Sequence, residues 1–493
     1  MKRENPAAYP LYSQPLALLT DLYQLTMAYS YWKEGLANRK ATFNLFFRKR
    51  PFRGSYAIAA GLEMVARYIE NFCFDPSDIA YLATLRDAGG GLLFESAFLN
   101  YLVGMKMECS LDAVPEGTPI FPHEPILRVT GPIIQAQLLE SPLLNLINFQ
   151  TLVATKASRI CRAAAGESVV EFGMRRAQGP DGALTATRGA YIGGCSGTSH
   201  LLAGKLFGIP VKGTHAHSWI MAFGSEEAAF DAWAAHMPTN CIFLVDTYDT
   251  IEGVKSAIRS GLKLRARGYE MIGVRLDSGD LAYLSIETRK LLDSAGFPEA
   301  QIMASNELDE HIIQDLKRQG AKITVWGVGT SLVTGNDQPA LDGVYKLAAI
   351  QNSSGQWEDK LKLSQDSAKT TNPGLLQIRR FELRGRYYGD MIFDERSPPE
   401  GPSRLIGLSD PSRRGYFGTD YTAHDLLVPI LREGKSVYTH PPLAAMRQRA
   451  GDELAKFDSR ILRFLNPEPY YTGFEEHYFA HKIDLIQTIR GES

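Results

Sequence analysis

Two histidines lie two positions apart in the segment 213–219, between a short apolar run and a pattern that predicts a helix. The segment reads Gly-Thr-His-Ala-His-Ser-Trp, so His215 and His217 have hydroxyl side chains as neighbours. A histidine can serve as a ligand, base or nucleophile near neutral pH. A glycine lets a substrate approach the backbone closely. A turn with two hydrogen-bonded histidines is the alternative, and this segment alone does not decide between the two.

Polar, small or charged residues follow a series of apolar runs in the middle of the chain. The carboxyl ends of parallel strands meet at one edge of a sheet, and barrels of this kind keep their active sites there. The sequence therefore predicts that these residues share one site. The segments are 171–176, 193–200, 213–218, 246–249, 275–280, 305–307 and 326–331.

The residue types at these positions indicate what the site could bind. Gly327, Gly329, Thr330 and Ser331 offer backbone N–H groups and hydroxyls at a predicted helix start, which suits phosphate. Arg175 and Arg275 can hold a carboxylate or phosphate with two hydrogen bonds. Acidic side chains could hold ribose hydroxyls or a magnesium–pyrophosphate group, although some could simply cap helices. These acidic candidates are Asp246, Asp249, Asp277 and Asp280.

The elements that must position these residues follow an alternating rhythm. Apolar, β-branched runs are separated by helical patterns, which predicts a parallel sheet with right-handed crossovers. About seven such units predict an irregular α/β barrel as the catalytic domain, residues 151–351. The predicted strands are 168–172, 209–212, 241–246, 271–276, 302–305, 323–328 and 344–350.

The flanking segments predict a second kind of architecture. Residues 1–150 predict an α+β domain, whose basic loop 48–54 could be solvated or could clamp phosphate. Residues 352–493 predict a polar loop, a hairpin and helices that complete the other domains. Within the flanks we expect helices at 20–32, 57–71, 75–86, 134–163 and 441–464, a strand at 41–47, short strands in 105–130 and a hairpin at 375–393.

The composition narrows the class of protein. With 493 residues, 44% hydrophobic and 22% charged, the chain has the make-up of a globular protein. Its formal charge of -2 gives no reason to expect nucleic acid or a membrane surface as a partner. Five scattered cysteines without a CxxC pair, and no signal peptide in residues 1–12, predict a reducing, cytoplasmic location. The cysteines are Cys73, Cys109, Cys161, Cys195 and Cys241.

With these motifs in place, the chain resembles the nicotinate phosphoribosyltransferase family, and the matching segments span most of it in family order. The matching segments are TDLYQLTMAYSYW (20–32), FFRKRPF (46–52), EFGMRRAQG (171–179), GTSHLLAG (197–204), GTHAHSW (213–219), VDTYDT (245–250), GVRLDSGDL (273–281), SNELDE (305–310) and WGVGTSLVT (326–334).

The resemblance implies a specific reaction. Nicotinate attacks C1 of phosphoribosyl pyrophosphate, which gives nicotinate mononucleotide and pyrophosphate in NAD salvage. ATP hydrolysis is coupled through a phosphohistidine, as in a ligase, and Mg²⁺ accompanies the pyrophosphate. By motif, His217 is the phosphorylated residue. A homodimer with its site at the interface is also implied.

The resemblance also assigns roles to other residues. Thr214 and Arg275 would bind nicotinate, with Arg175 as a further anchor. Tyr23, reaching across the dimer, and Phe172 would stack on the two faces of the pyridine ring. Asp277 would hold ribose hydroxyls. Thr330, within the glycine-rich segment described above, would hold the 5-phosphate.

Ser199 bears on the choice between nicotinate and nicotinamide. The related nicotinamide enzymes carry an aspartate at the corresponding position, where it accepts a hydrogen bond from the amide NH2. An aspartate would repel a carboxylate, whereas a serine does not. Ser199 therefore favours nicotinate as the substrate.

Two other classes of protein are alternatives to this family: metal-dependent amidohydrolases and binding proteins without catalysis. Metal-dependent amidohydrolases also carry His-x-His after a barrel strand, where the pair holds zinc. Their later strands supply further histidines, whereas the later strand ends here carry Asp246, Arg275, Asn306 and Gly327. A binding protein without catalysis has no need for arginines, carboxylates and glycines at one rim. Both alternatives are therefore disfavoured.

Overall fold

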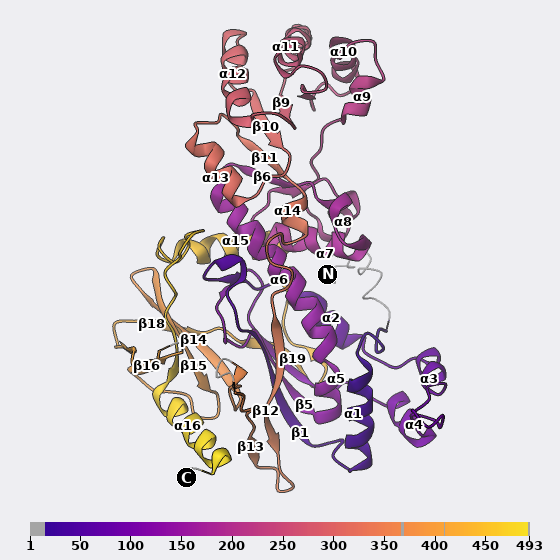
Figure 1. Cartoon of the computed structure of the whole chain (residues 1–493), viewed down its shortest axis with the longest axis vertical. Helices are drawn as coiled ribbons and strands as arrows, with labels where there is room; N and C mark the ends of the chain where they lie inside the picture. Colours follow the sequence, from indigo (N-terminus) through magenta and orange to yellow (C-terminus); the bar gives the residue numbers. More distant parts are fainter. Residues whose placement is uncertain (1–14, 366–368, 409, 492–493) are drawn as a thin grey trace. The chain divides into compact units, whose positions relative to one another are not determined.

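The computed structural model describes residues 15–365, 369–408 and 410–491 of the chain, which fold into two compact units (Figure 1). One unit holds residues 153–339, and the other combines residues 1–152 with 340–493. In the described residues, no helix has the length and apolar character needed to cross a bilayer. Residues 1–12, where we expect no signal peptide, lie outside the described part.

The unit of residues 153–339 is built on a parallel sheet of six strands in the order β7-β6-β11-β10-β9-β8. Figure 1 shows β6, β11, β10 and β9 following one another in this order, with helices beside them. The strand bounds are β6 (Ser168–Glu171), β7 (Gly197–Thr198), β8 (Ile242–Leu244), β9 (Gly273–Leu276), β10 (Gln301–Ser305) and β11 (Val325–Val328).

Helices connect these strands, as the alternating pattern predicted. Three of the helices begin at an aspartate whose side chain accepts backbone N–H groups of the first turn: Asp249, Asp280 and Asp309. Such a cap contributes about 1 kcal/mol. The helix bounds are α7 (Gly179–Ile192), α8 (Leu201–Phe207), α9 (His217–Met221), α10 (Glu226–His236), α11 (Thr250–Ala266), α12 (Leu281–Ser294), α13 (Glu310–Arg318) and α14 (Thr330–Val333).

The sheet differs from the predicted seven strands at three places. β7 (Gly197–Thr198) is a strand that the pattern did not predict. Residues 344–350, predicted as its last strand, belong to β12 (Gly343–Gln351), which pairs antiparallel with β1 (Lys40–Phe47) of the other unit. Residues 209–212 contribute only a single bridge, between Val211 and Thr198. The apolar pattern reports that a segment is buried, but not which strand it pairs with. For this reason the pattern could not assign 344–350 to the correct sheet.

The other unit contains a larger, antiparallel sheet made from both ends of the chain. Its order is β13-β12-β1-β5-β3-β19-β20, so β1 lies between two strands of distant sequence. The remaining strands are β3 (Ser110–Ala113), β5 (Leu127–Pro132), β13 (Trp357–Asp359), β19 (Val428–Arg432) and β20 (Lys435–Ser436). The predicted helices are present, although 57–71 also includes β2 (Ala57–Ile58). They are α1 (Leu22–Lys33), α2 (Leu62–Glu70), α3 (Pro76–Leu82), α5 (Ile133–Leu138) and α6 (Glu140–Ala163). Helix α4 (Ser96–Val103) was not predicted.

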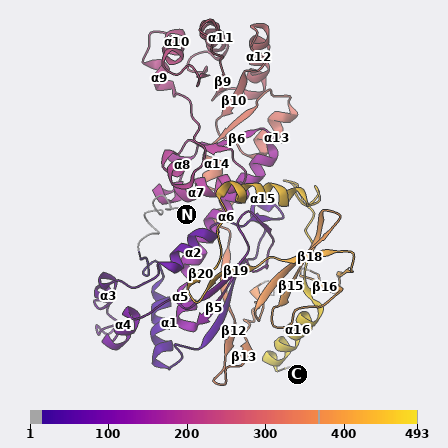
Figure 2. The same cartoon turned by 180° about the vertical axis from the view of Figure 1, so that it is seen from behind.

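A second sheet of this unit is formed by C-terminal residues, in the order β17-β16-β21-β15-β14-β18. Figure 2 shows helix α16 (Glu476–Arg490) beside β16 and β15. The predicted hairpin is β14 (Leu376–Leu383) with β15 (Arg386–Asp394). The other elements are β16 (Ser403–Gly407), β17 (Arg414–Phe417), β18 (Thr422–Asp425), β21 (Thr472–Glu475) and α15 (Leu443–Ala455); β4 (Pro119–Ile120) pairs with β2.

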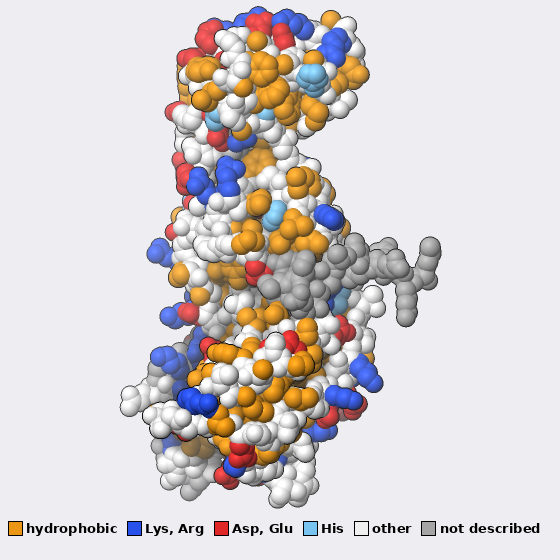
Figure 3. Space-filling model, turned by 90° about the vertical axis from the view of Figure 1, so that its right-hand side faces the viewer, with side chains coloured by type: hydrophobic (Ala, Val, Ile, Leu, Met, Phe, Trp, Pro, Cys, Tyr) orange, Lys and Arg blue, Asp and Glu red, His pale blue; other side chains and the backbone are white. Residues whose placement is uncertain are grey.

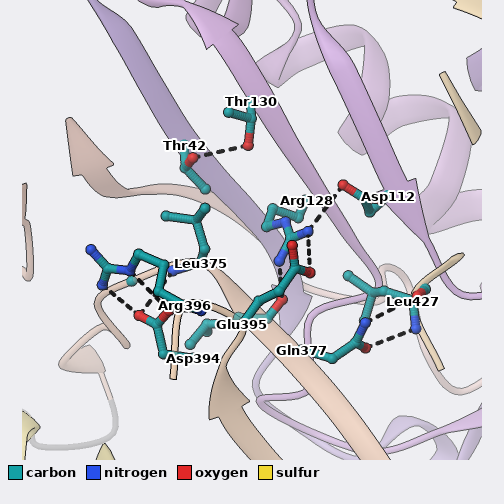
Figure 4. A network of polar contacts seen from close by, with 12 residues as sticks. Thr42, Asp112, Arg128, Thr130, Leu375, Gln377, Asp394, Glu395, Arg396 and Leu427 are labelled. Atoms are coloured by element: carbon teal, nitrogen blue, oxygen red, sulfur yellow. Dashed lines mark hydrogen bonds and ion pairs between the residues drawn. The ribbon is translucent and has the colours of Figure 1, made fainter. Parts of the chain in front are cut away.

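A buried arginine ties the C-terminal segments to the N-terminal strands of this unit (Figure 4). Arg128 on β5 donates from Nη2 to Asp112 at 3.0 Å and to Glu395 at 2.6 Å, and from Nη1 to the carbonyl of Leu376 at 3.1 Å. An unpaired buried charge is costly, so these bonds must form together. Together with the pairing of β12 with β1 and of β19 with β3, the network joins residues 340–493 to residues 1–152.

A second buried network surrounds Arg380. Its guanidinium donates to both oxygens of Asp390, and Tyr470 donates to the same carboxylate at 3.0 Å. Glu124 is fully buried beside this group. Burial, and then the charge of Asp390, raise the pKa of Glu124 well above its ordinary value. The folded protein therefore favours the protonated form of Glu124.

We expect Glu124→Gln to make the stability of the protein less dependent on pH. A raised pKa in the folded state stabilises the fold below the ordinary pKa of glutamate, about 4.3, and this contribution is lost as the pH rises. Glutamine keeps an acceptor and a donor but does not titrate. The free energy of unfolding of the variant, measured in urea from pH 4 to 8, should rise relative to wild type as the pH increases. The exposed Glu34→Gln is the control, and equal pH profiles for Glu124→Gln and wild type would contradict the assignment.

Candidate functional site

Arg275, at the end of β9, is the centre of the polar groups at the carboxyl edge of the parallel sheet. Its Nε donates to Ser305 Oγ at 2.8 Å, Nη1 to Thr214 Oγ1 at 3.1 Å, and Nη2 to Asp277 Oδ1 at 3.0 Å. The guanidinium also lies 5.7 Å from the centre of the Phe172 ring. Three hydrogen bonds fix its plane, so the predicted residues Arg275, Asp277, Thr214 and Phe172 do come together.

Two aspartates hold the loop that follows β9. Asp246 is almost fully buried and accepts from the backbone N–H of Asp277 at 2.9 Å and from Ser278 Oγ at 2.6 Å. Burial tends to raise the pKa of Asp277, but the hydrogen bond from Ser305 and the charge of Arg275 outweigh it and lower that pKa. Asp277 is therefore an anion at neutral pH, and negative charge is fixed at this edge.

His217 is the first residue of α9 and faces both of these carboxylates. Its Nε2 lies 3.9 Å from Asp246 Oδ1 and 3.8 Å from Asp277 Oδ2. Its Nδ1 is 3.2 Å from Thr247 Oγ1. The side chain is 39% exposed, so it is oriented by neighbours yet open to a reactant. Asp246 and Thr247 are consecutive residues just after β8, so one short segment supplies two of the groups around His217.

His215, the other histidine of the pair, has a different environment. It is buried against the aromatic rings of Trp233, Phe230 and Phe243. Burial lowers the pKa of His215 to about 4, so the imidazole is neutral under physiological conditions. Its Nε2 accepts from the backbone N–H of Leu244 at 3.5 Å. His215 is thus a packing residue that anchors the segment from which His217 projects.

The glycine-rich segment after β11 is shaped around Phe172. A Cβ atom added to Gly327 would lie 2.7 Å from Phe172 Cδ2, so only glycine lets the ring lie against this strand. Gly329 precedes α14, whose first residue, Thr330, is half-buried, and Ser331 is buried. The predicted phosphate-binding segment therefore begins next to the predicted stacking ring.

A buried glutamate supports the end of β6. Glu171 accepts from Thr198 Oγ1 at 2.6 Å, from Thr187 Oγ1 at 2.9 Å, and from the backbone N–H of Gly173. These bonds join β6, α7 and β7. They also set the turn that carries Phe172 inward and Arg175 to an exposed position. Ser199, also exposed, donates its backbone N–H to the carbonyl of Glu171 at 3.0 Å.

Two of the acidic candidates for metal binding have another role. The Asp249 and Asp280 side chains accept from backbone N–H groups of α11 and α12, at 2.9 and 3.0 Å. Across residues 15–365, 369–408 and 410–491, no group of three His, Cys, Asp or Glu side chains could hold a metal ion. Asp246 instead orders the loop after β9.

Two predicted contributors belong to the other unit. Tyr23 is the second residue of α1 and is 48% exposed. The basic loop 48–54 lines a cavity of about 930 Å³ in that unit, together with Arg413 and Tyr471. An anion would fit the charge of this cavity.

Sequence comparisons decide the family. Profiles of the nicotinate phosphoribosyltransferase N-terminal domain, family and C-terminal domain match residues 18–148, 168–379 and 377–482. The nicotinate phosphoribosyltransferase of Bacillus subtilis (strain 168) is 42% identical over 489 residues, 98% of this chain and 97% of the relative. The chain belongs to the nicotinate phosphoribosyltransferase family. The Homo sapiens member is 34% identical over 521 residues and covers 94% of this chain and 95% of its own.

Solved structures agree with this membership. Human nicotinic acid phosphoribosyltransferase superposes with a TM-score of 0.82 at 31% identity, over 94% of this chain and 99% of its own. The nicotinate-nucleotide pyrophosphorylase of Pyrococcus furiosus, at 22% identity and a TM-score of 0.69, shares the fold over 92% of this chain and 99% of its own. The resemblance to the nicotinate phosphoribosyltransferase family is therefore confirmed. Sequence reasoning gave no role to Ser305, Thr247 or Glu171, although each lies at a predicted strand end.

Proposed function

We propose that the protein is a nicotinate phosphoribosyltransferase that joins nicotinate to 5-phosphoribosyl 1-pyrophosphate and couples this step to ATP hydrolysis through a phosphohistidine at His217. The products are nicotinate mononucleotide and pyrophosphate. The main support is the position of Asp277 at one edge of the sheet. Its carboxylate lies 3.0 Å from Arg275 Nη2 and 3.8 Å from His217 Nε2. Membership of the family adds the identity of the substrates.

Nicotinate is an anion with a flat ring, and the groups around Arg275 suit both features. Nη1 and Nη2 each carry a second N–H, which can form a fork for the carboxylate. Phe172 offers a face for the pyridine ring. Thr214, which accepts from Nη1, adds a hydroxyl at the same place. This arrangement directs the ring nitrogen away from Arg275.

The sugar must develop positive charge at C1 as pyrophosphate leaves. A fixed carboxylate near the ring stabilises such a transition state, and the low pKa of Asp277 keeps that charge in place. In this proposal Asp277 also holds the ribose hydroxyls, while Gly327, Gly329, Thr330 and Ser331 hold the 5-phosphate. Arg175 is a further anchor for the substrate. Mg²⁺ accompanies the pyrophosphate and neutralises the leaving group.

The role of His217 depends on its surroundings. Thr247 orients the ring by its contact with Nδ1, and the exposed fraction of the side chain gives ATP access. A phosphoryl group on the imidazole would place new negative charge beside Asp246 and Asp277. Their repulsion would make the phosphorylated state one that favours transfer or release. Phosphorylation by ATP and later loss of the phosphoryl group would add and remove this charge in turn. The affinity of the site for its substrates and products would then alternate.

A coupled assay tests the proposal. Purified protein is incubated with nicotinate, phosphoribosyl pyrophosphate and Mg²⁺, with and without ATP, and nicotinate mononucleotide, pyrophosphate and ADP are quantified. We expect mononucleotide in both arms and a higher yield, with ADP, when ATP is present. No mononucleotide in either arm would refute the transferase, whereas mononucleotide without ADP formation would refute only the coupling. Omission of Mg²⁺ should reduce the rate strongly.

We expect Ser199→Asp to weaken the use of nicotinate. The exposed Ser199 follows Thr198 at the rim, so a carboxylate there would repel the carboxylate of nicotinate and could accept from an amide. The kcat/KM for nicotinate should fall about tenfold or more, equivalent to roughly 1.4 kcal/mol, and the relative rate with nicotinamide should rise. Ser199→Asn is the uncharged control of similar size. Wild-type protein that uses both substrates equally would contradict this role.

We also propose a cytoplasmic homodimer in which Tyr23 of one copy stacks on nicotinate in the other. The support is exposed apolar surface on α1 and the turn before it, at Leu19, Leu22, Tyr23 and Met27. Figure 3 shows hydrophobic side chains gathered on one face of the unit that combines residues 1–152 with 340–493. Such a patch usually marks an interface. Light scattering should give twice the chain mass of 54.6 kDa, and a monomer would contradict it.

A further inference from the structure

Ser305, the last residue of β10, lies between the two groups on which substrate binding is proposed to depend. Its buried hydroxyl accepts from Arg275 Nε at 2.8 Å and donates to Asp277 Oδ1. No other side chain of the described residues is shown bonded to both Arg275 and Asp277. β10 is the strand next to β9, so the contact arises from sheet pairing rather than from the sequence motif around Arg275.

The backbone around Ser305 fixes the position of this hydroxyl. Ser305 pairs with Gly327 on β11, on the other side of β10 from Arg275. The next two residues, Asn306 and Glu307, have φ of 104° and 39°. Non-glycine residues in this region carry strain that the surrounding fold must support. The strand therefore ends abruptly after Ser305.

The geometry of the guanidinium shows what the serine does for Arg275. A hydrogen bond at Nε occupies the inner edge of the guanidinium plane. Nη1 and Nη2 each use one N–H for Thr214 and Asp277, and we assign their second N–H groups to the bidentate fork that a carboxylate requires. Without a partner at Nε, the plane would be held only by the bonds of Nη1 to Thr214 and of Nη2 to Asp277. The fork would then be less closely preorganised for the substrate.

We propose that Ser305 is a positioning residue that orients Arg275 toward the carboxylate of nicotinate and holds Asp277 as its fixed counter-charge. The inference rests on the proposed function and adds a determinant of substrate specificity to it. Hydrogen bonds to charged groups contribute about 1.5–3 kcal/mol, which corresponds to roughly tenfold to a hundredfold in binding.

Replacement of the hydroxyl provides the first test. We expect Ser305→Ala to raise the KM for nicotinate about tenfold to a hundredfold, with a smaller change in the KM for phosphoribosyl pyrophosphate. The loss of a donor to Asp277 should also move the acid limb of the kcat/KM profile to higher pH. Ser168→Ala, which removes a hydroxyl from the opposite end of the same sheet, is the matched control. An unchanged nicotinate KM together with an unchanged acid limb would overturn the proposal.

A second pair of variants separates the hydroxyl from packing. Ser305→Thr and Ser305→Val have nearly the same shape, so they share any cost of the extra methyl group. We expect Thr to bind nicotinate at least tenfold more tightly than Val in calorimetric titrations, after thermal unfolding has shown that both are folded. Equal affinities would overturn the role of Ser305. Binding of nicotinate by wild type without turnover would instead refute the proposed transferase and leave the Thr–Val comparison as the test.

Discussion

We expect Arg275→Ala to lose almost all activity with nicotinate. The change removes the proposed fork for the carboxylate and also leaves Asp277 without its cationic partner, at 3.0 Å in the folded protein. Removal of one partner from a largely buried ion pair costs about 3–5 kcal/mol. If the loss is expressed in the transition state, kcat/KM falls roughly two hundredfold to five thousandfold.

Arg275→Lys refines this prediction. Lysine keeps the positive charge but offers a point charge instead of a planar fork, so it cannot bond Ser305, Thr214 and Asp277 in the same geometry. We expect at least a tenfold loss in kcat/KM for nicotinate, intermediate between wild type and Arg275→Ala. Arg265→Lys, at an exposed ion pair of α11, is the matched control and should retain full activity. Full activity in Arg275→Lys would show that charge alone is required there.

The second large effect concerns the proposed phosphohistidine. We expect wild-type protein incubated with γ-labelled ATP to carry an acid-labile, base-stable label, and His217→Asn to carry none. Asparagine can still meet the hydroxyl of Thr247 but has no imidazole to phosphorylate. The stimulation of nicotinate mononucleotide formation by ATP should therefore disappear, so that rates with and without ATP become equal.

The control for this experiment is His236→Asn, an exposed histidine at the end of α10. It should keep both the label and the stimulation. His217→Ala tests the same point without any side-chain polarity. An undiminished label in His217→Ala, or no label on wild type, would refute the phosphohistidine.

Several parts of the site could be predicted from the sequence because they depend on local pattern. The alternation of apolar runs with helical patterns indicated the parallel sheet. That sheet brings Arg275, Asp277 and Thr214 to one edge, as expected. Phe172 lies beside them because Gly327 leaves room for its ring.

Other parts required the tertiary structure because they depend on which segments pair. The pattern at 344–350 correctly indicated a strand, but its partner is β1, about three hundred positions away in the chain. The two histidines of one motif are equivalent in the sequence, yet burial against aromatic rings makes His215 a packing residue. His217 alone is left open to a reactant.

Taken by itself, the sequence determined the family, the segments that end parallel strands and the chemical types gathered there, because periodicity and motif spacing are local properties. Only the tertiary structure decided that Ser305 bridges Arg275 and Asp277, that Thr247 meets His217, and that Asp249 and Asp280 cap helices. A hydrogen bond requires two atoms within about 3 Å in a fixed orientation. That proximity is created by strand pairing and loop conformation, which no local pattern of residues specifies.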